Sequence, residues 1–186
     1  MPRPKTISDA EVIEAALATL AEKGPAFTIT DIADRVKLSR ATLIQRFGDR
    51  QAILLRMADF QVEQTRLWLD GMPSESGPAA FRAFVETIVN SMGEGAGFSA
   101  HVAIAALEAR DPALRARAAE RYRLVQQAIA QRAAFHRDPM GFAGHVHAVI
   151  AGATMQWVAD HGQSGLADFI LARLRWAIAE MAPEKP

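Results

Sequence analysis

The segment from residue 39 to residue 47 carries side chains of the types that recognise base pairs. Helical spacing places one set on the outer face of a short helix: Arg40, Ala41, Thr42, Gln45 and Arg46. Thr and Ala can contact a thymine methyl group, Gln can pair with adenine, and Arg can reach guanine or a phosphate. These residue types therefore favour hydrogen bonding and apolar contact in the major groove of DNA.

Two short helices joined by a tight turn are predicted around this set. Thr28 is an N-cap residue with Asp31 at the capping-box position, and Ser39 begins a second helix after a turn of about three residues. That spacing is typical of a helix-turn-helix. The two helices share an apolar underside, which we predict to consist of Ile32, Ala33, Val36, Leu38, Leu43 and Phe47.

Positive charge is concentrated in the same segment. The whole chain is neutral, with 21 Lys and Arg residues against 21 Asp and Glu residues. Residues 37–50 nevertheless have a local charge of +3, from Lys37, Arg40, Arg46 and Arg50 against Asp49. The N-terminal ends of both helices, at Thr28 and Ser39, also present backbone N–H groups that can bind phosphate. This local charge indicates a nucleic-acid partner, which the total charge does not.

Composition limits the fold and the compartment. A chain of 186 residues, half of them hydrophobic, can bury a substantial core. Apolar residues recur at helical spacing and strand patterns are nearly absent, so we predict an all-α fold of about nine helices. The chain contains no Cys, which excludes disulfides and Cys-based zinc sites. We find no secretory signal and no apolar stretch of membrane length, and we expect a cytoplasmic protein without a membrane partner.

A longer pattern extends from residue 8 to residue 60. Its matching positions are Thr28, Asp31-Ile32-Ala33, Leu38-Ser39, Thr42-Leu43, Phe47 and Ile53-Leu54. This pattern resembles the TetR family of transcriptional repressors. The resemblance implies a three-helix helix-turn-helix DNA-binding domain over residues 1–49 and a larger helical ligand-binding and dimerisation domain over residues 50–186. It also implies that the third helix reads the groove and that Arg50, at the start of the fourth, contacts the DNA backbone.

Three positions depart from the usual pattern of that family. Lys37 stands in the turn where Gly is usual, Ile44 replaces a Tyr, and Arg46 replaces a His. A Lys in the left-handed conformation costs roughly 1 kcal/mol, but its charge can add a phosphate contact. Ile44 cannot make the phosphate contact that a Tyr makes, but Arg46 can supply a phosphate contact in its place.

The resemblance predicts a DNA-binding transcriptional regulator, namely a ligand-released repressor that binds a palindromic operator in double-stranded DNA as a homodimer. The predicted DNA contacts are Thr28, Lys37, Ser39, Arg40, Ala41, Thr42, Gln45, Arg46 and Arg50. The alternative is a helical ligand-binding or protein-interaction module without operator binding, and the departures at Lys37 and Ile44 keep this alternative open.

The resemblance further implies that the last two long helices form the dimer interface and that a small-molecule effector binds among the middle helices. The predicted interface residues are Val146, Val149, Ile150, Ala153, Trp157, Phe169, Ile170 and Leu174. The candidate effector contacts combine polar with aromatic and apolar side chains, and they are Trp68, Phe84, Ile88, Phe98, His101, Tyr122, Gln126 and Met155.

Catalysis is not expected from this sequence. It lacks paired carboxylates, a Gly-rich phosphate loop and a nucleophile elbow. His145 and His147 are two residues apart on a predicted helix, so they face different directions and do not indicate a metal site. We therefore expect neither an enzyme nor a cofactor.

Overall fold

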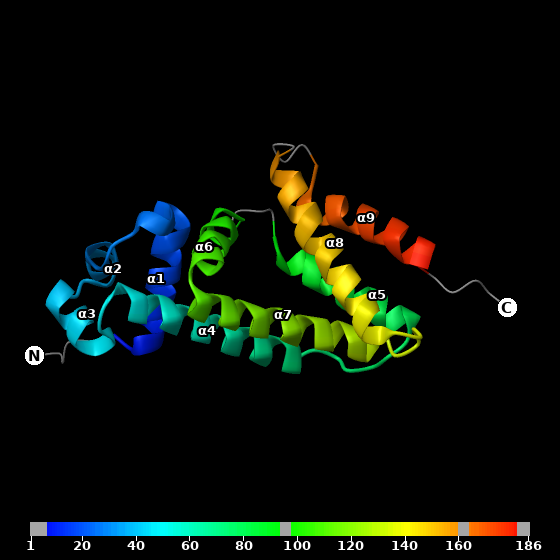
Figure 1. Cartoon of the computed structure of the whole chain (residues 1–186), viewed down its shortest axis with the longest axis horizontal. Coiled ribbons are helices and arrows are strands. Elements are labelled where there is room, and N and C mark those ends of the chain that lie inside the picture. Colours follow the sequence, from blue (N-terminus) through cyan, green and yellow to red (C-terminus); the bar gives the residue numbers. More distant parts are fainter. Residues whose placement is uncertain (1–6, 94–97, 160–163, 182–186) are drawn as a thin grey trace, which may run out of the picture. The chain divides into compact units, whose positions relative to one another are not determined.

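The computed structural model describes residues 7–93, 98–159 and 164–181, and within these ranges the chain is helical without strands (Figure 1). The elements in order are α1 (Asp9–Lys23), a short 3₁₀ helix (Gly24–Ala26), α2 (Ile29–Val36), α3 (Arg40–Phe47), α4 (Arg50–Asp70), α5 (Pro78–Ser91), α6 (Phe98–Arg110), α7 (Pro112–Arg132), α8 (Pro139–Ala159) and α9 (Leu166–Met181). The predicted all-α fold is confirmed, as is the predicted number of helices in the described residues.

Local capping residues determine where the N-terminal helices begin. Ser8 and Thr28 each form a complete capping box, with Glu11 and Asp31 as the returning carboxylates. Ser39 caps α3 by accepting a hydrogen bond from the backbone N–H of Thr42, at 3.0 Å. These side chains satisfy backbone donors that a helix leaves unpaired in its first turn, and the predicted starts of α1, α2 and α3 are confirmed.

The described residues pack as two compact units. Unit 1 contains α1, α2, α3 and α6, with α4 as far as Thr65 and α7 as far as Arg121. Unit 2 contains α5, α8 and α9, with the remaining parts of α4 and α7. The predicted domain boundary after residue 49 remains a prediction about function, because the packing units follow a different division of the chain.

Each unit has its own hydrophobic core. The core of unit 1 joins the three N-terminal helices to α4, and its fully buried side chains include Leu20, Ile32, Leu43 and Ile53. The predicted underside of the helix pair belongs to this core: Ile32, Ala33, Leu43 and Phe47 are buried, while Val36 and Leu38 are partly buried. Apolar packing against α1 and α4 therefore holds the helices that carry the predicted DNA contacts.

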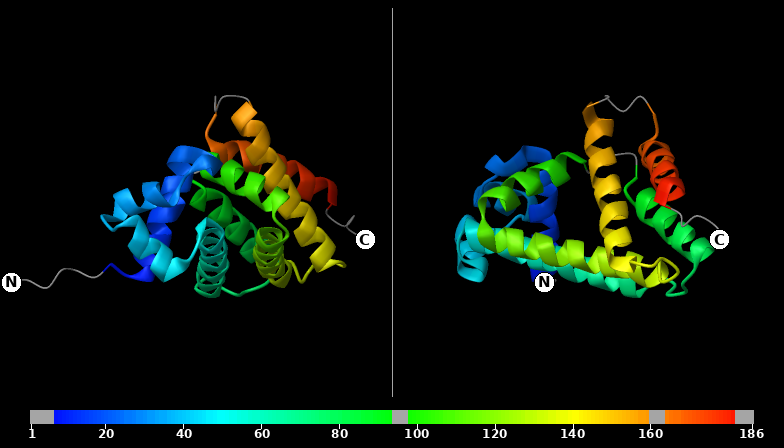
Figure 2. Two further views of the ribbon diagram at one scale, coloured as in Figure 1. Left: turned by 60° about the vertical axis from the view of Figure 1, so that its left-hand side comes forward. Right: turned by 45° about the vertical axis from the view of Figure 1, so that its right-hand side comes forward.

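In unit 2, α8 and α9 lie side by side, and α5 packs against α9 (Figure 2). Apolar residues from α5, α7, α8 and α9 form one continuous cluster, with Phe81, Ile129 and Ile170 fully buried. None of the described helices is both long enough and apolar enough to span a membrane.

Candidate nucleic-acid interface

The turn between α2 and α3 is made by a lysine in the left-handed conformation. Lys37 has φ 55° and ψ 39°, and it is the one non-glycine residue with positive φ among the described residues. Its N–H and that of Leu38 both bond to the carbonyl of Ala33, the second at 3.0 Å. The predicted left-handed Lys is confirmed, and it places an exposed ammonium group directly before α3.

The outer face of α3 presents a mixture of basic, amide and apolar side chains. Arg40, Ala41 and Gln45 are exposed, and Ile44 keeps 38% of its surface accessible. Within the described part of the chain, no hydrogen bond or ion pair engages the side chains of Arg40 and Gln45. Both are therefore available to a partner outside the chain.

Three of the predicted contacts are hydroxyl groups already engaged at helix starts. The Ser39 and Thr42 hydroxyl oxygens are 2.8 Å apart, and Thr42 is half-buried. The Thr28 hydroxyl donates to the Asp31 carboxylate at 2.7 Å. Each side chain lies at a helix N-terminus, where the backbone N–H groups favour an anion.

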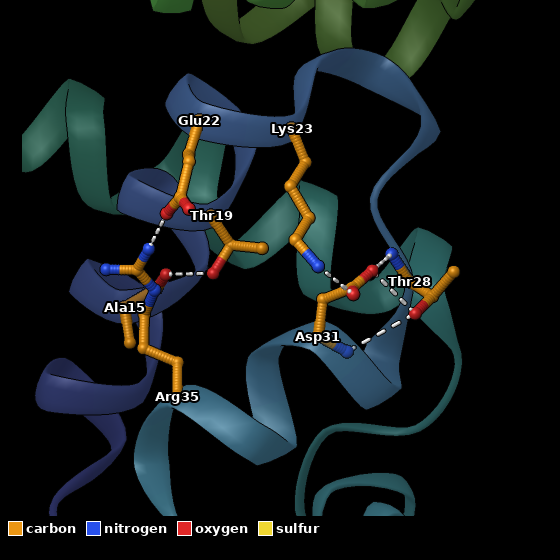
Figure 3. A network of polar contacts seen from close by, with 7 residues as sticks. All are labelled: Ala15, Thr19, Glu22, Lys23, Thr28, Asp31 and Arg35. Atoms are coloured by element: carbon orange, nitrogen blue, oxygen red, sulfur yellow. Dashed lines mark hydrogen bonds and ion pairs between the residues drawn. The ribbon is translucent and has the colours of Figure 1, made fainter.

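A carboxylate joins the end of α1 to the start of α2 (Figure 3). The Asp31 side chain accepts hydrogen bonds from the Lys23 ammonium group at 2.5 Å and from the Thr28 backbone N–H at 2.7 Å. These donors lower the pKa of Asp31 to about 2, with Lys23 as the largest cause, and the same contact raises the pKa of Lys23. A second ion pair between the two helices joins Arg35 to Glu22.

The two arginines at the edges of the helix pair have partners inside the chain. The Arg46 guanidinium donates to the carbonyl of Ile7 at 3.2 Å and forms an ion pair with Asp9. The Arg50 Nε donates to the carbonyl of Phe27 at 2.9 Å, and its guanidinium lies 4.6 Å from the centroid of that aromatic ring. Both arginines are half-buried, so they hold α3 and α4 against the preceding helices.

The candidate effector contacts differ widely in burial. Phe84 and Ile88 are buried in the core of unit 2, whereas Trp68, Tyr122 and Met155 are exposed. Gln126 is partly buried, and the side chains of Phe98 and His101 lie outside the described residues. A small cavity in unit 1 is lined by none of these eight residues, but by apolar side chains of α1, α4, α6 and α7 together with Gln61 and Glu108.

Some histidine and arginine contacts in unit 2 were not foreseen from the sequence. The His147 ring packs edge-on against Tyr122, with centroids 5.1 Å apart, while His145 is exposed. The buried Arg132 places its guanidinium 3.8 Å from the centroid of Phe84. The partners come from different helices, so the sequence alone has no local pattern that reveals them.

The predicted dimer residues divide into two groups. Five of them are buried in the core of their own chain: Val146, Ile150, Ala153, Ile170 and Leu174. The other three, Val149, Trp157 and Phe169, are partly buried. The opposite faces of the same helices are exposed, and they include Met155 at 58% and Trp176 at 68% accessible surface.

Comparison with known protein families agrees with the geometry of the N-terminal helices. The model of bacterial regulatory proteins of the tetR family matches residues 12–57, from α1 into α4. The N-terminal domain is a TetR-family domain. The match includes the turn at Lys37 and the whole of α3, so the departures at Lys37 and Ile44 lie within a recognisable TetR-family helix-turn-helix. No curated protein matches the chain by sequence.

Solved structures extend the likeness to the whole fold. A protein from Rhodococcus sp., described as a TetR-family transcriptional regulator, is 20% identical with a TM-score of 0.70, over 91% of this chain and 96% of that chain. SmeT, the repressor of the Stenotrophomonas maltophilia multidrug efflux pump SmeDEF, is 14% identical with a TM-score of 0.68, over 94% and 90%. A regulator from Saccharomonospora viridis, solved in complex with choline, is 19% identical with a TM-score of 0.65, over 90% and 93%. The TetR-family fold therefore covers both units.

Proposed function

We propose that this protein is a cytoplasmic transcriptional repressor that binds a palindromic operator as a homodimer and leaves it when a small molecule binds. The outer face of α3 carries this proposal. It offers Arg40 and Gln45, whose side chains have no partner among the described residues, close to the exposed Lys37 and inside a TetR-family domain. Side chains of these types can bind base edges and phosphates in a major groove.

The exposed face of α8 supports the homodimer. Gly144, Ala148, Gly152 and Met155 recur on one side of this helix, opposite the buried residues that face the core. Among the described residues outside its own helix backbone, a Cβ atom at Gly144 or Gly152 would meet nothing within 4 Å. Because glycine inside a helix costs about 1 kcal/mol relative to alanine, the fold of one chain gives no reason for either glycine. Close approach of α8 from a second copy does give one.

Exposed residues of α9 extend the same argument. Ala172 and Trp176 lie four residues apart on its accessible side. Two helices from each subunit would form a four-helix bundle that buries this apolar surface. A two-fold dimer then presents two copies of α3 to half-sites about 34 Å apart, one turn of DNA.

Release of the operator requires that the helix-turn-helix of unit 1 responds to an effector, and six of the eight candidate effector contacts belong to unit 2. Both α4 and α7 have residues in each unit. Inside unit 1 the two helices are joined by polar contacts: Arg117 Nε donates to Asp59 at 2.6 Å, and Arg121 donates to Gln61 at 3.3 Å. A displacement of α7 would therefore be passed to α4 and to the helix-turn-helix that precedes it. The effector shifts the equilibrium only by its difference in affinity for the two arrangements.

Binding to the DNA upstream of the coding sequence of this protein tests the proposal. We expect a band shift that depends steeply on salt, and we expect Arg40→Ala to weaken binding about tenfold through loss of a base or phosphate contact. Arg82→Ala on α5 removes the same charge from an exposed position in unit 2 and should bind as the wild type does. Equal losses in the two variants, or no shift with any upstream fragment, would instead favour a helical ligand-binding or protein-interaction module.

A further inference from the structure

Ile44 is an exposed aliphatic side chain on a helix surface that is otherwise suited to polar contacts. It retains 38% of its accessible surface, whereas Leu43 beside it is completely buried. Residues three and four positions apart share a helix face, so Ile44 lies beside Ala41 and Arg40. Gln45 follows on the next part of the same exposed surface.

The chemistry of Ile44 limits what it can contact in a major groove. It has no atom that donates or accepts a hydrogen bond, so it cannot bind a phosphate oxygen or a polar base edge. Among the four bases, only thymine presents an apolar group in the major groove, its C5 methyl. Burial of that methyl against Ile44 and the small Ala41 removes apolar surface of both partners from water.

Its polar neighbours define the surroundings of that contact. Gln45 can form a bidentate pair with adenine, and Arg40 can reach guanine or a phosphate. Neither side chain is engaged by another described residue. The apolar pair Ala41 and Ile44 thus lies between two polar side chains that can fix the register on the duplex.

We propose that Ile44, packed beside Ala41, is a specificity-determining residue that selects thymine by its C5 methyl group at one position of each operator half-site. This inference rests on the proposed operator binding. It adds a base preference that the hydrogen-bonding residues of α3 do not supply.

The test compares thymine with deoxyuridine, which lacks only the methyl group. The 186-residue chain first selects duplexes from a randomised DNA library, and each thymine of the selected sequence is then replaced in turn by deoxyuridine. At one symmetric pair of positions, we expect wild-type affinity to fall about fourfold for each methyl removed, the loss that corresponds to one buried methylene-sized group. Ile44→Ala should lose most of this preference, because only the small contact of the methyl group with Ala41 remains.

Two controls separate the possible failures. Arg40→Ala should weaken binding to both duplexes and retain the methyl preference, and circular dichroism should show unchanged helix content in both variants. The inference is overturned if the wild type ignores the methyl at every position, or if Ile44→Ala keeps the wild-type preference. If the library yields no selected sequence, operator binding itself fails, which is a different outcome from selection without a methyl preference.

Discussion

The guanidinium group of Arg46 is committed to partners within the chain. Because it binds both Ile7 and Asp9, we expect Arg46→Ala to lower the free energy of unfolding by about 0.5–1 kcal/mol, the range for a partly exposed pair. The salt dependence of DNA binding should stay unchanged, because no phosphate contact is lost. Urea unfolding and fluorescence anisotropy at several salt concentrations measure the two effects.

Asp9→Asn tests the same ion pair from its acidic side. It removes the anionic partner, so its cost should resemble that of Arg46→Ala, and the double variant should lose no more than the larger single loss. Unchanged stability in Arg46→Ala together with a salt slope lower by about one would show that Arg46 binds a phosphate instead.

Lys37 combines a strained backbone with a useful charge. Lys37→Gly relieves the left-handed conformation, and we expect a gain in unfolding free energy of up to about 1 kcal/mol, reduced by the greater freedom of glycine in the unfolded chain. Operator affinity should fall in the same variant, with a salt slope lower by about one. Thermal unfolding and anisotropy provide the two measurements. A loss of both stability and affinity would contradict the role of strain.

Helix starts could be predicted from the sequence, whereas the partners of several side chains could not. The caps at Ser8, Thr28 and Ser39 depend on residues within three positions, and all three are confirmed. The contact between Arg46 and Asp9 joins residues 37 positions apart, and no local pattern encodes it. Capping depends on residues that are close in the sequence, whereas packing brings together residues that are far apart in it.

The sequence also did not predict which face of α8 is buried in the core of its own chain. Its residues are apolar around most of the helix, so periodicity does not distinguish the face toward its own core from the face toward a partner. The structure distinguishes the two faces by burial: Val146 and Ile150 are buried, while Gly152 and Met155 are exposed. The sequence predicted the helix correctly, whereas the exposed face of α8, on which we propose the dimer interface, is visible only in the structure.

The stability that the contacts between α1 and α2 contribute should depend on pH, because Asp31 titrates. Its pKa is lowered to about 2 by Lys23 and Thr28, while an unfolded Asp titrates near 3.9. The folded state therefore binds fewer protons, and the stability that Asp31 contributes is complete above about pH 4 and is lost as the pH falls toward about 2. We expect Asp31→Asn to remove this part of the pH dependence, measured as the urea midpoint between about pH 5 and pH 2.5.

Asp34→Asn is the matched control for that experiment. Asp34 is exposed on the same helix, and no hydrogen bond of its side chain is found among the described residues. This variant should retain the wild-type loss of stability on acidification. An unaltered pH profile in Asp31→Asn would show that its contacts with Lys23 and Thr28 do not contribute to folding.

At the level of the whole molecule, the proposed homodimer depends on α8 and α9. Gly152→Leu should produce monomers, because the added side chain fills the space that a second α8 would occupy. The same substitution favours helix formation, and its Cβ would meet no neighbouring element within 4 Å among the described residues, so circular dichroism should show an unchanged helix content. Sedimentation at micromolar concentration measures the oligomeric state.

Two further variants make the dimer test specific. Trp176→Glu adds a charge to the exposed face of α9 and should also yield monomers, whereas Ala83→Leu enlarges an exposed position on α5 and should leave the dimer intact. Dimers that persist in both Gly152→Leu and Trp176→Glu would place the interface elsewhere.

The division into two units has an optical consequence. All three tryptophans of the chain and its one tyrosine, namely Trp68, Tyr122, Trp157 and Trp176, belong to unit 2. Intrinsic fluorescence therefore reports on unit 2 alone, while far-ultraviolet circular dichroism follows the helices of both units. Denaturation curves from the two signals coincide only if the units unfold together. Quenching of the intrinsic emission by an added ligand would report a change around the aromatic residues of unit 2, because unit 1 contains neither tryptophan nor tyrosine.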